Sequence, residues 1–135
     1  MAGYSSTPLA KKLGIKNGFK IRLINQPDHY FNLFTDLPTD IQILTDKKTK
    51  KNFIHLFVKN MNEFEKNIHE LKNEIEPDGI IWVSWYKKSA KILTDVTEDK
   101  IRNTALSIGL VDIKVCAVDE VWSGLKLVIP VKDRK

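Results

Sequence analysis

Polar and aromatic residues that could bind a small molecule follow the ends of several apolar runs. The candidate ligand-binding residues are Asn25, Asp28, His29, Lys59, Asn60, Trp85, Lys87, Lys88, Trp122 and Ser123. Ligands of open parallel sheets bind beyond the carboxyl ends of the strands, so we expect these side chains to share one rim. An indole can stack on a planar ring, and an ammonium group can neutralise an anion. The pattern predicts a small anionic or nucleotide-like ligand.

The same residues also suit purely structural roles. Trp85 and Trp122 could be packing residues, and the lysines could be solvated loop residues. Asn60 stands directly before a helical pattern, where it could cap the helix, with Glu63 reaching back to it. The sequence leaves the binding and the packing interpretations open.

The turn after the first apolar strand lacks a phosphate-binding motif. The run KIRLIN is followed by Asn25-Gln26-Pro27-Asp28, where many α/β nucleotide-binding proteins carry a glycine-rich loop. Such loops bring backbone N–H groups close to phosphates. We therefore predict a nucleotide-type scaffold whose first crossover has lost that cradle.

Residues for nucleophilic or metal-assisted catalysis do not stand out. No serine lies in a nucleophile-elbow motif, and the histidines and acids show no zinc-ligand spacing. His55 lies in an apolar strand and is expected to hydrogen-bond locally, and Cys116, between Val115 and Ala117, is expected to be a buried, inert thiol. The sequence predicts no catalytic residue and no metal site, and it identifies no cofactor; whether the protein is an enzyme stays open, with the balance against it.

Apolar periodicity and capping residues place the elements that must position these groups. Five apolar residues from Met61 to Ile75 recur at steps of three and four, which predicts a helix ended by Pro77-Asp78-Gly79. Thr97 should cap a helix that Gly109 ends. The expected strands are 20–25, 41–44, 52–58, 80–85, 111–118 and 125–129, and the expected helices are a short one within 4–18, then 29–37, about 61–76 and about 98–108.

This order of elements predicts a three-layer αβα sandwich of Rossmann-like type. Right-handed crossovers place helices on both faces of a mostly parallel sheet. The link from residue 119 to 124 is too short for a crossover helix, so the last two strands form an antiparallel hairpin. At 135 residues the chain is expected to be a single domain, with residues 1–18 as an N-terminal arm.

The sequence resembles two known groups of proteins. The order of strands and helices along the chain and the final hairpin after a glycine-terminated helix resemble Rossmann-like methyltransferases, with the departure that NQPD replaces their glycine-rich loop. The segments YSSTPLAKKLGIK, WVSWYKKSAKILTDVTED and GLVDIKVCAVDEVWSGLKLVIP look like the bacterial family named domain of unknown function 3052. That resemblance spans Tyr4 to about Val131 and implies the fold and a bacterial, cytoplasmic setting, without an activity.

Composition and charge bound the remaining hypotheses. No apolar run is long enough to cross a membrane, no secretory signal is evident, and the single cysteine fits a reducing compartment, so we expect a cytoplasmic protein. The net charge of +5 is unevenly distributed, with clusters of basic residues at 11–22, 47–51 and 87–91. The leading hypothesis is a non-enzymatic module that binds a small ligand or a protein partner, including a second copy. The alternatives are an enzyme with atypical nucleotide-like cofactor contacts, resembling a degenerate methyltransferase, and a nucleic-acid binder, which the absence of a basic helix stripe disfavours.

Overall fold

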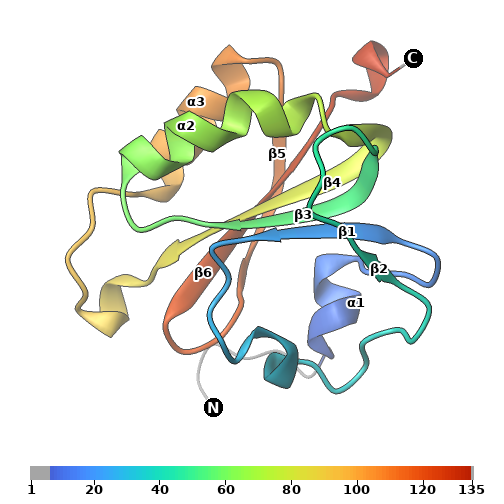
Figure 1. Cartoon of the computed structure of the whole chain (residues 1–135). Coiled ribbons are helices and arrows are strands. Elements are labelled where there is room, and N and C mark those ends of the chain that lie inside the picture. Colours follow the sequence, from blue (N-terminus) through green and yellow to red (C-terminus); the bar gives the residue numbers. More distant parts are fainter. Residues whose placement is uncertain (1–6, 135) are drawn as a thin grey trace.

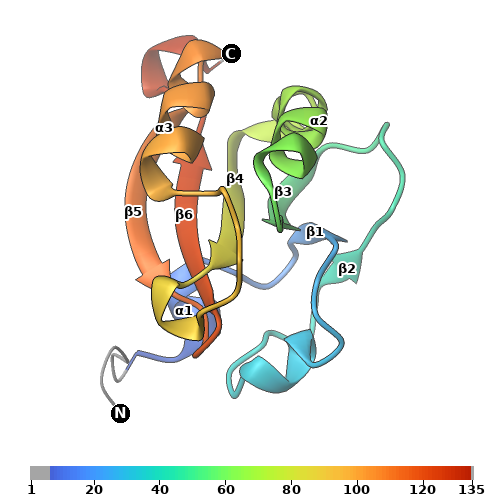
Figure 2. The ribbon, with the colours of Figure 1, turned by 90° about the vertical axis from the view of Figure 1, so that its left-hand side faces the viewer.

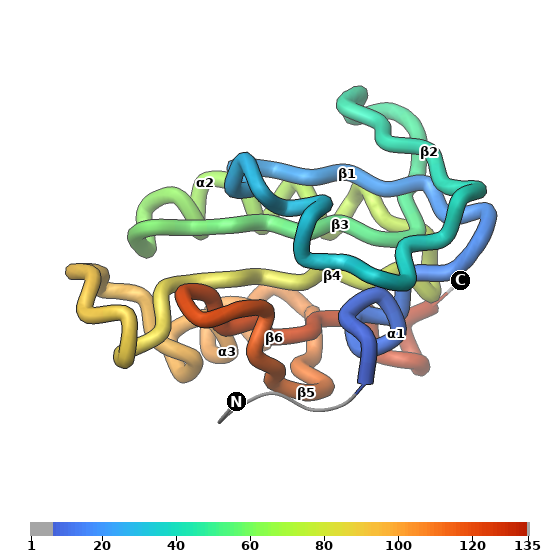
Figure 3. The backbone as a smooth tube through the Cα atoms, turned by 90° about the horizontal axis from the view of Figure 1, so that it is seen from below, coloured from blue at the N-terminus to red at the C-terminus, as the bar shows by residue number. Residues whose placement is uncertain are grey.

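A computed structural model describes residues 7–134 and contains one six-stranded mixed sheet. The strands lie in the order β2-β1-β3-β4-β6-β5, which Figure 3 shows from the underside. β1, β2, β3 and β4 are parallel, whereas β6 runs antiparallel to both β4 and β5. The strands are β1 Lys20–Ile24, β2 Gln42–Ile43, β3 Lys51–Phe57, β4 Ile75–Tyr86, β5 Val111–Ala117 and β6 Trp122–Val128.

Helices cover both faces of this sheet, as Figure 1 shows. α2 (Met61–Lys72) and α3 (Glu98–Ser107) lie on one face, and α1 (Leu9–Leu13) lies on the other. Short 3-10 turns occur at η1 Tyr30–Leu33, η2 Lys88–Ala90 and η3 Val131–Asp133. The predicted α/β class, with a mostly parallel sheet and a C-terminal antiparallel hairpin, is confirmed.

The face under α2 and α3 holds the larger apolar core. Phe64, Ile68 and Leu71 of α2 are buried against strand residues such as Leu56 and Val83. Their spacing of three to four residues places them on one side of the helix, which is why the sequence pattern predicts this element. β3 is buried on both faces, as its nearly continuous apolar run predicts.

The helix is shorter than its pattern predicts. It ends at Lys72, and Ile75 instead pairs with Lys51 as the first residue of β4. The register then shifts, so that Phe53 pairs with Ile80 and the intervening residues form an irregularity in the strand. Hydrogen bonding to β3 therefore overrides the helical periodicity, because a buried backbone must find partners.

The opposite face is covered by α1, η1 and the loops that join them. Trp82 of β4 donates its indole N–H to the carbonyl of Leu13 at 2.8 Å, which fastens α1 to the sheet. Gly14 ends α1 with a φ of 87°, in the left-handed region that favours glycine. Pro8 occupies the N-cap position of α1 without a side-chain bond.

The predicted helix at 29–37 is wrong except for its first turn. Only η1 forms there, and the backbone is extended at Phe34 and bends at residues 35 and 36. The carboxylate of Asp36 accepts hydrogen bonds from the backbone of Ala10 and Lys11, at 3.0 and 3.1 Å. These contacts with α1 keep the segment after η1 from forming a helix. The apolar residues Leu33 and Phe34 still pack on the sheet.

Candidate functional site

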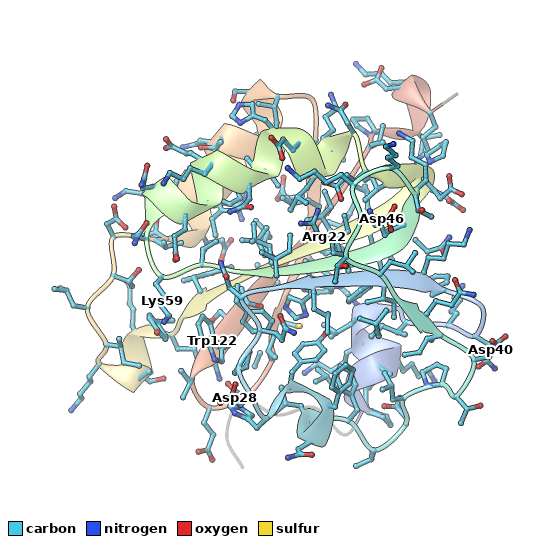
Figure 4. The ribbon with its side chains drawn as sticks, in the orientation of Figure 1. Arg22, Asp28, Asp40, Asp46, Lys59 and Trp122 are labelled. Atoms are coloured by element: carbon cyan, nitrogen blue, oxygen red, sulfur yellow. The ribbon has the colours of Figure 1, made fainter. Side chains whose placement is uncertain are left out.

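The carboxyl ends of the parallel strands β1, β3 and β4 lie at the same end of the sheet. Asp28, Lys59 and Trp122 lie along this end of the sheet in Figure 4. β6 begins there too, because Tyr86 and Trp85 at the end of β4 pair with Trp122 and Ser123. The ten candidate residues are therefore brought to one end of the sheet, but they separate into two groups. Four of them line a concave surface, and the other six lie outside it.

A concave surface of about 870 Å³ holds the first group. Trp85, Lys87, Lys88 and Ser123 line it, together with residues of the loop at 89–97 and the first turn of α3. This surface lies at the end of β4. The switch point of the strand order, where such sheets usually bind ligands, lies instead between β1 and β3. At the switch point the N-terminus of α2 is occupied by side chains of the protein itself, whereas the surface at the end of β4 is open.

After β1 the backbone turns without starting an α-helix. Asn25 has a φ of 59°, a left-handed conformation that asparagine tolerates better than most residues. Asn25, Asp28 and His29 are exposed, and η1 follows them directly. The predicted loss of the phosphate cradle agrees with this geometry, since a 3-10 turn offers no helix N-terminus to an anion.

The N-terminus of α2, after β3, is capped by the chain's own side chains. Asn60 accepts a hydrogen bond from the backbone of Glu63 at 2.8 Å, so it serves as the N-cap. Asp95 accepts from the backbone of Met61 at 2.9 Å, and the Glu63 carboxylate accepts from that of Lys59 at 2.6 Å. Carboxylates thus occupy the place where an anionic ligand would bind a helix N-terminus.

His29 links the β1 exit to the hairpin between β5 and β6. Its Nε2 lies 3.2 Å from a carboxylate oxygen of Asp119. The other oxygen of Asp119 accepts backbone hydrogen bonds from Val121 and Trp122, at 2.8 and 2.7 Å. His29 is about half exposed, at 51% of its side chain, so it remains open to solvent beside this turn.

Both indoles lie mainly inside the protein. Trp122 is stacked on Tyr86, with ring centroids 4.5 Å apart, and its ring meets Phe57 edge-on at 5.0 Å. Trp85 belongs to the core under α2 and α3 and is 7% exposed. Packing is therefore a role of both residues, and only part of Trp85 reaches the concave surface.

The acidic residues on the wall of this surface are already paired with a cation. Arg102 of α3 contacts Glu98 and Asp99, and its Nε donates to Asp112 at 2.9 Å. Hydrogen bonds to Asp112 and Glu98 raise the pKa of the Arg102 guanidinium further above its usual range. Lys88, which is exposed, lies on the same surface as Glu98 and Asp99, and both of these acids are oriented toward Arg102.

A buried polar network next to the site was not predicted. The Tyr30 hydroxyl lies 2.9 Å from His55 Nδ1, and His55 Nε2 lies 2.7 Å from the Ser84 hydroxyl. The expected local bonding of His55 is wrong, since both partners are distant in sequence. Burial lowers the pKa of His55 to about 3 and raises that of Tyr30. All three side chains are shielded from solvent, so the network stabilises the fold and is closed to a substrate.

Neither metal-binding clusters nor membrane-spanning helices are found within residues 7–134. No group of three or more His, Cys, Asp or Glu residues could hold a metal ion in that range. No helix there has the length and apolar character needed to cross a bilayer. Cys116, expected to be buried, is half-buried, and burial raises the pKa of its thiol.

Solved structures with similar folds include several methyltransferases. A ribosomal protein L11 methylase from Lactobacillus delbrueckii subsp. bulgaricus matches with a TM-score of 0.59 and 10% identity, over 89% of this chain and 74% of that one. The glycopeptide N-methyltransferase MtfA complexed with sinefungin matches with a TM-score of 0.57 and 9% identity, over 90% and 83%. LepI in complex with SAM matches with a TM-score of 0.53 and 11% identity, over 90% and 39%.

Comparisons of sequence identify no family for this chain. No family model matches the chain, and no curated protein matches it. The resemblance to domain of unknown function 3052 therefore stays a prediction. At such low identities the structural matches establish the fold alone, and that fold is the methyltransferase-like α/β sandwich.

Proposed function

We propose that this chain is a ligand-binding module with a methyltransferase-like fold and no catalytic set of its own. Its ligand is small, planar and anionic or nucleotide-like, and it lies in the concave surface at the end of β4. The observation that carries this proposal is the convergence of Lys87, Lys88, Ser123 and one edge of Trp85 on that surface.

Charge supports an anionic group on the ligand. Arg102 partly compensates the carboxylates of Glu98 and Asp99, and the exposed ammonium group of Lys88 offers the surface a positive charge for an anion. The volume of about 870 Å³ lies within the usual range for small-molecule sites. Ser123 offers a hydroxyl that could donate to or accept from the same ligand.

A second candidate function is binding of an adenosyl compound in support of methyl transfer. The structural neighbours favour it, because two of them are complexes with sinefungin or SAM. Against it stand the missing glycine-rich loop after β1 and the self-capped α2 N-terminus. Asn25 in its left-handed conformation would be the central contact of such a ligand.

Calorimetric titration with S-adenosylmethionine, S-adenosylhomocysteine and ATP tests both functions. We expect at least one anionic or nucleotide-like compound to bind, and Lys88→Ala to weaken it about tenfold. Lys66→Ala, which removes an exposed lysine from α2, is the matched control and should leave affinity unchanged.

The variants separate the two sites. If Asn25→Ala abolishes binding while Lys88→Ala has no effect, the ligand lies at the β1 end and the adenosyl alternative is favoured. If no compound binds at millimolar concentration, and native mass spectrometry of the purified protein shows no bound small molecule, the ligand-binding proposal is overturned.

A further inference from the structure

The outer edge of β5 is open among the residues that the structure describes. β5 is the last strand in the sheet order, and it forms one side of the molecule in Figure 2. Ile113 and Val115 on this strand are 53% and 45% exposed. An edge of this kind presents unpaired backbone groups that a further strand can bind.

Lysines gather beside this edge, on the face of the sheet that carries α1. Lys114 of β5 lies directly opposite Lys126 of β6 in the strand register. Lys12 of α1 donates to the carbonyl of Ala117 at 3.0 Å, at the end of β5. Burial, then the charges of Lys114 and Lys16, lower the pKa of Lys126.

No carboxylate in residues 7–134 forms an ion pair with Lys12, Lys16, Lys114 or Lys126. Asp112 of β5 is engaged by Arg102, and Asp119 after β5 is engaged by His29 and backbone N–H groups. Like charges directly opposite each other in a sheet are destabilising. The cluster therefore carries an uncompensated positive charge that an external acidic group would relieve.

The strand geometry leaves a regular stretch for pairing. A bulge interrupts the register between Asp112 and Lys114, and bulges and lysines both protect edges against indiscriminate pairing. From Lys114 to Ala117 the register with β6 is regular again. Pairing with a second copy of β5 would bring two such lysine clusters together, so charge disfavours a homodimer at this edge.

We propose that the outer edge of β5 binds an acidic extended segment of a partner protein, which adds as a strand beside Lys114–Cys116, up to the Ala117 carbonyl that Lys12 already occupies. Side chains of a strand alternate between the two faces. The partner's carboxylates therefore lie on the side of Lys114, Lys126 and Lys16, and its apolar side chains lie on the side of Val115.

A labelled peptide of about six alternating Asp and Val residues tests this proposal by fluorescence anisotropy. We expect it to bind, and we expect a Lys-Val peptide and an N-methylated Asp-Val peptide to fail. The first control removes the charge match, and the second keeps the charge but removes the backbone N–H groups. Lys16→Glu/Lys114→Glu should weaken binding about tenfold.

Lys48→Glu/Lys66→Glu, which changes the net charge equally at exposed positions away from β5, should weaken binding less than about twofold. Lys114→Gln supplies a milder variant if the double reversal does not fold. Equal binding of the N-methylated peptide, equal loss in both double variants, or tighter binding of a single-stranded oligonucleotide than of the Asp-Val peptide would overturn the proposal. Absence of Asp-Val binding at millimolar concentration would overturn it as well.

Discussion

His55 is an ionisable side chain held in its neutral form inside the sheet. It is fully buried on β3, stacked on Phe57 at a centroid distance of 4.3 Å and bonded to Tyr30 and Ser84. The two hydroxyls satisfy a neutral imidazole in which one ring nitrogen donates and the other accepts, and burial away from water disfavours the charged, doubly protonated ring. Protonation of His55 is thus linked to unfolding.

The pH dependence of stability should reveal this residue. The pKa of His55 is about 3 when folded, against 6.5 in the unfolded chain, so the unfolded state binds more protons between these values. From pH 7 to 5 this group should reduce the free energy of unfolding by about 2 kcal/mol. Urea unfolding of the wild type and His55→Gln measures it, and the variant should lose that part of the slope.

His69→Gln is the matched control for this experiment, because it removes an exposed histidine from α2. The control should keep the slope of the wild type. An unchanged slope in His55→Gln would show that another group carries the pH dependence.

The first turn of α2 is the element that most directly shapes the candidate site. Asn60, Glu63 and Asp95 together satisfy backbone N–H groups at or just before the helix start. Thr94 reinforces the arrangement by donating to the carbonyl of Lys59 at 2.7 Å. The part of the loop at 89–97 that leads into α3 is consequently tied to the start of α2, and this loop forms a wall of the concave surface.

Loss of the cap should weaken the whole fold. Asn60→Ala removes the acceptor for the Glu63 N–H and should lower the free energy of unfolding by about 1 kcal/mol. Asn62→Ala, an exposed position in the same turn, should be neutral or slightly stabilising because alanine favours helix. Equal effects in urea unfolding would show that Asn60 has no capping role.

At the scale of the whole molecule, a buried ion cluster joins three parts of the sheet. Glu74, just before β4, accepts from Arg22 of β1 at 2.6 and 2.8 Å and from Lys51 of β3 at 3.1 Å. Lys51 is fully buried, and its ammonium group also contacts the carbonyl of Asp46. The cluster secures the amino ends of the strands, opposite the candidate site.

Neutralising the carboxylate of Glu74 should strongly lower the free energy of unfolding. Glu74→Gln leaves the cations of Arg22 and Lys51 near one another, and Lys51 has no access to water. The change should lower the free energy of unfolding by about 3–5 kcal/mol. Glu70→Gln is the control, because its pair with Lys47 is exposed and should change stability by less than about 1 kcal/mol. Denaturant unfolding compares them, and similar losses in both variants would contradict the role of the cluster.

The elements that the sequence predicts correctly are those whose signal is local. The apolar run of β3, the capping residues Asn60 and Thr97 and the glycine after α3 act over a few neighbouring residues. The errors at 29–37 and after Lys72 arise where hydrogen bonds to distant segments, such as Asp36 with α1, outweigh local periodicity. Such partners cannot be read from spacing along the chain.

The same distinction applies to the candidate site. The chain by itself determined the α/β class, the C-terminal hairpin and the absence of a glycine-rich loop, because residue type and periodicity specify strands, helices and turns locally. Only the tertiary structure decided which polar groups stay available. Folding used Asn60 and Asp95 as caps, buried His55 with Tyr30 and Ser84, and left Lys88 and Ser123 at the open surface, since a buried polar group must find partners wherever the fold supplies them.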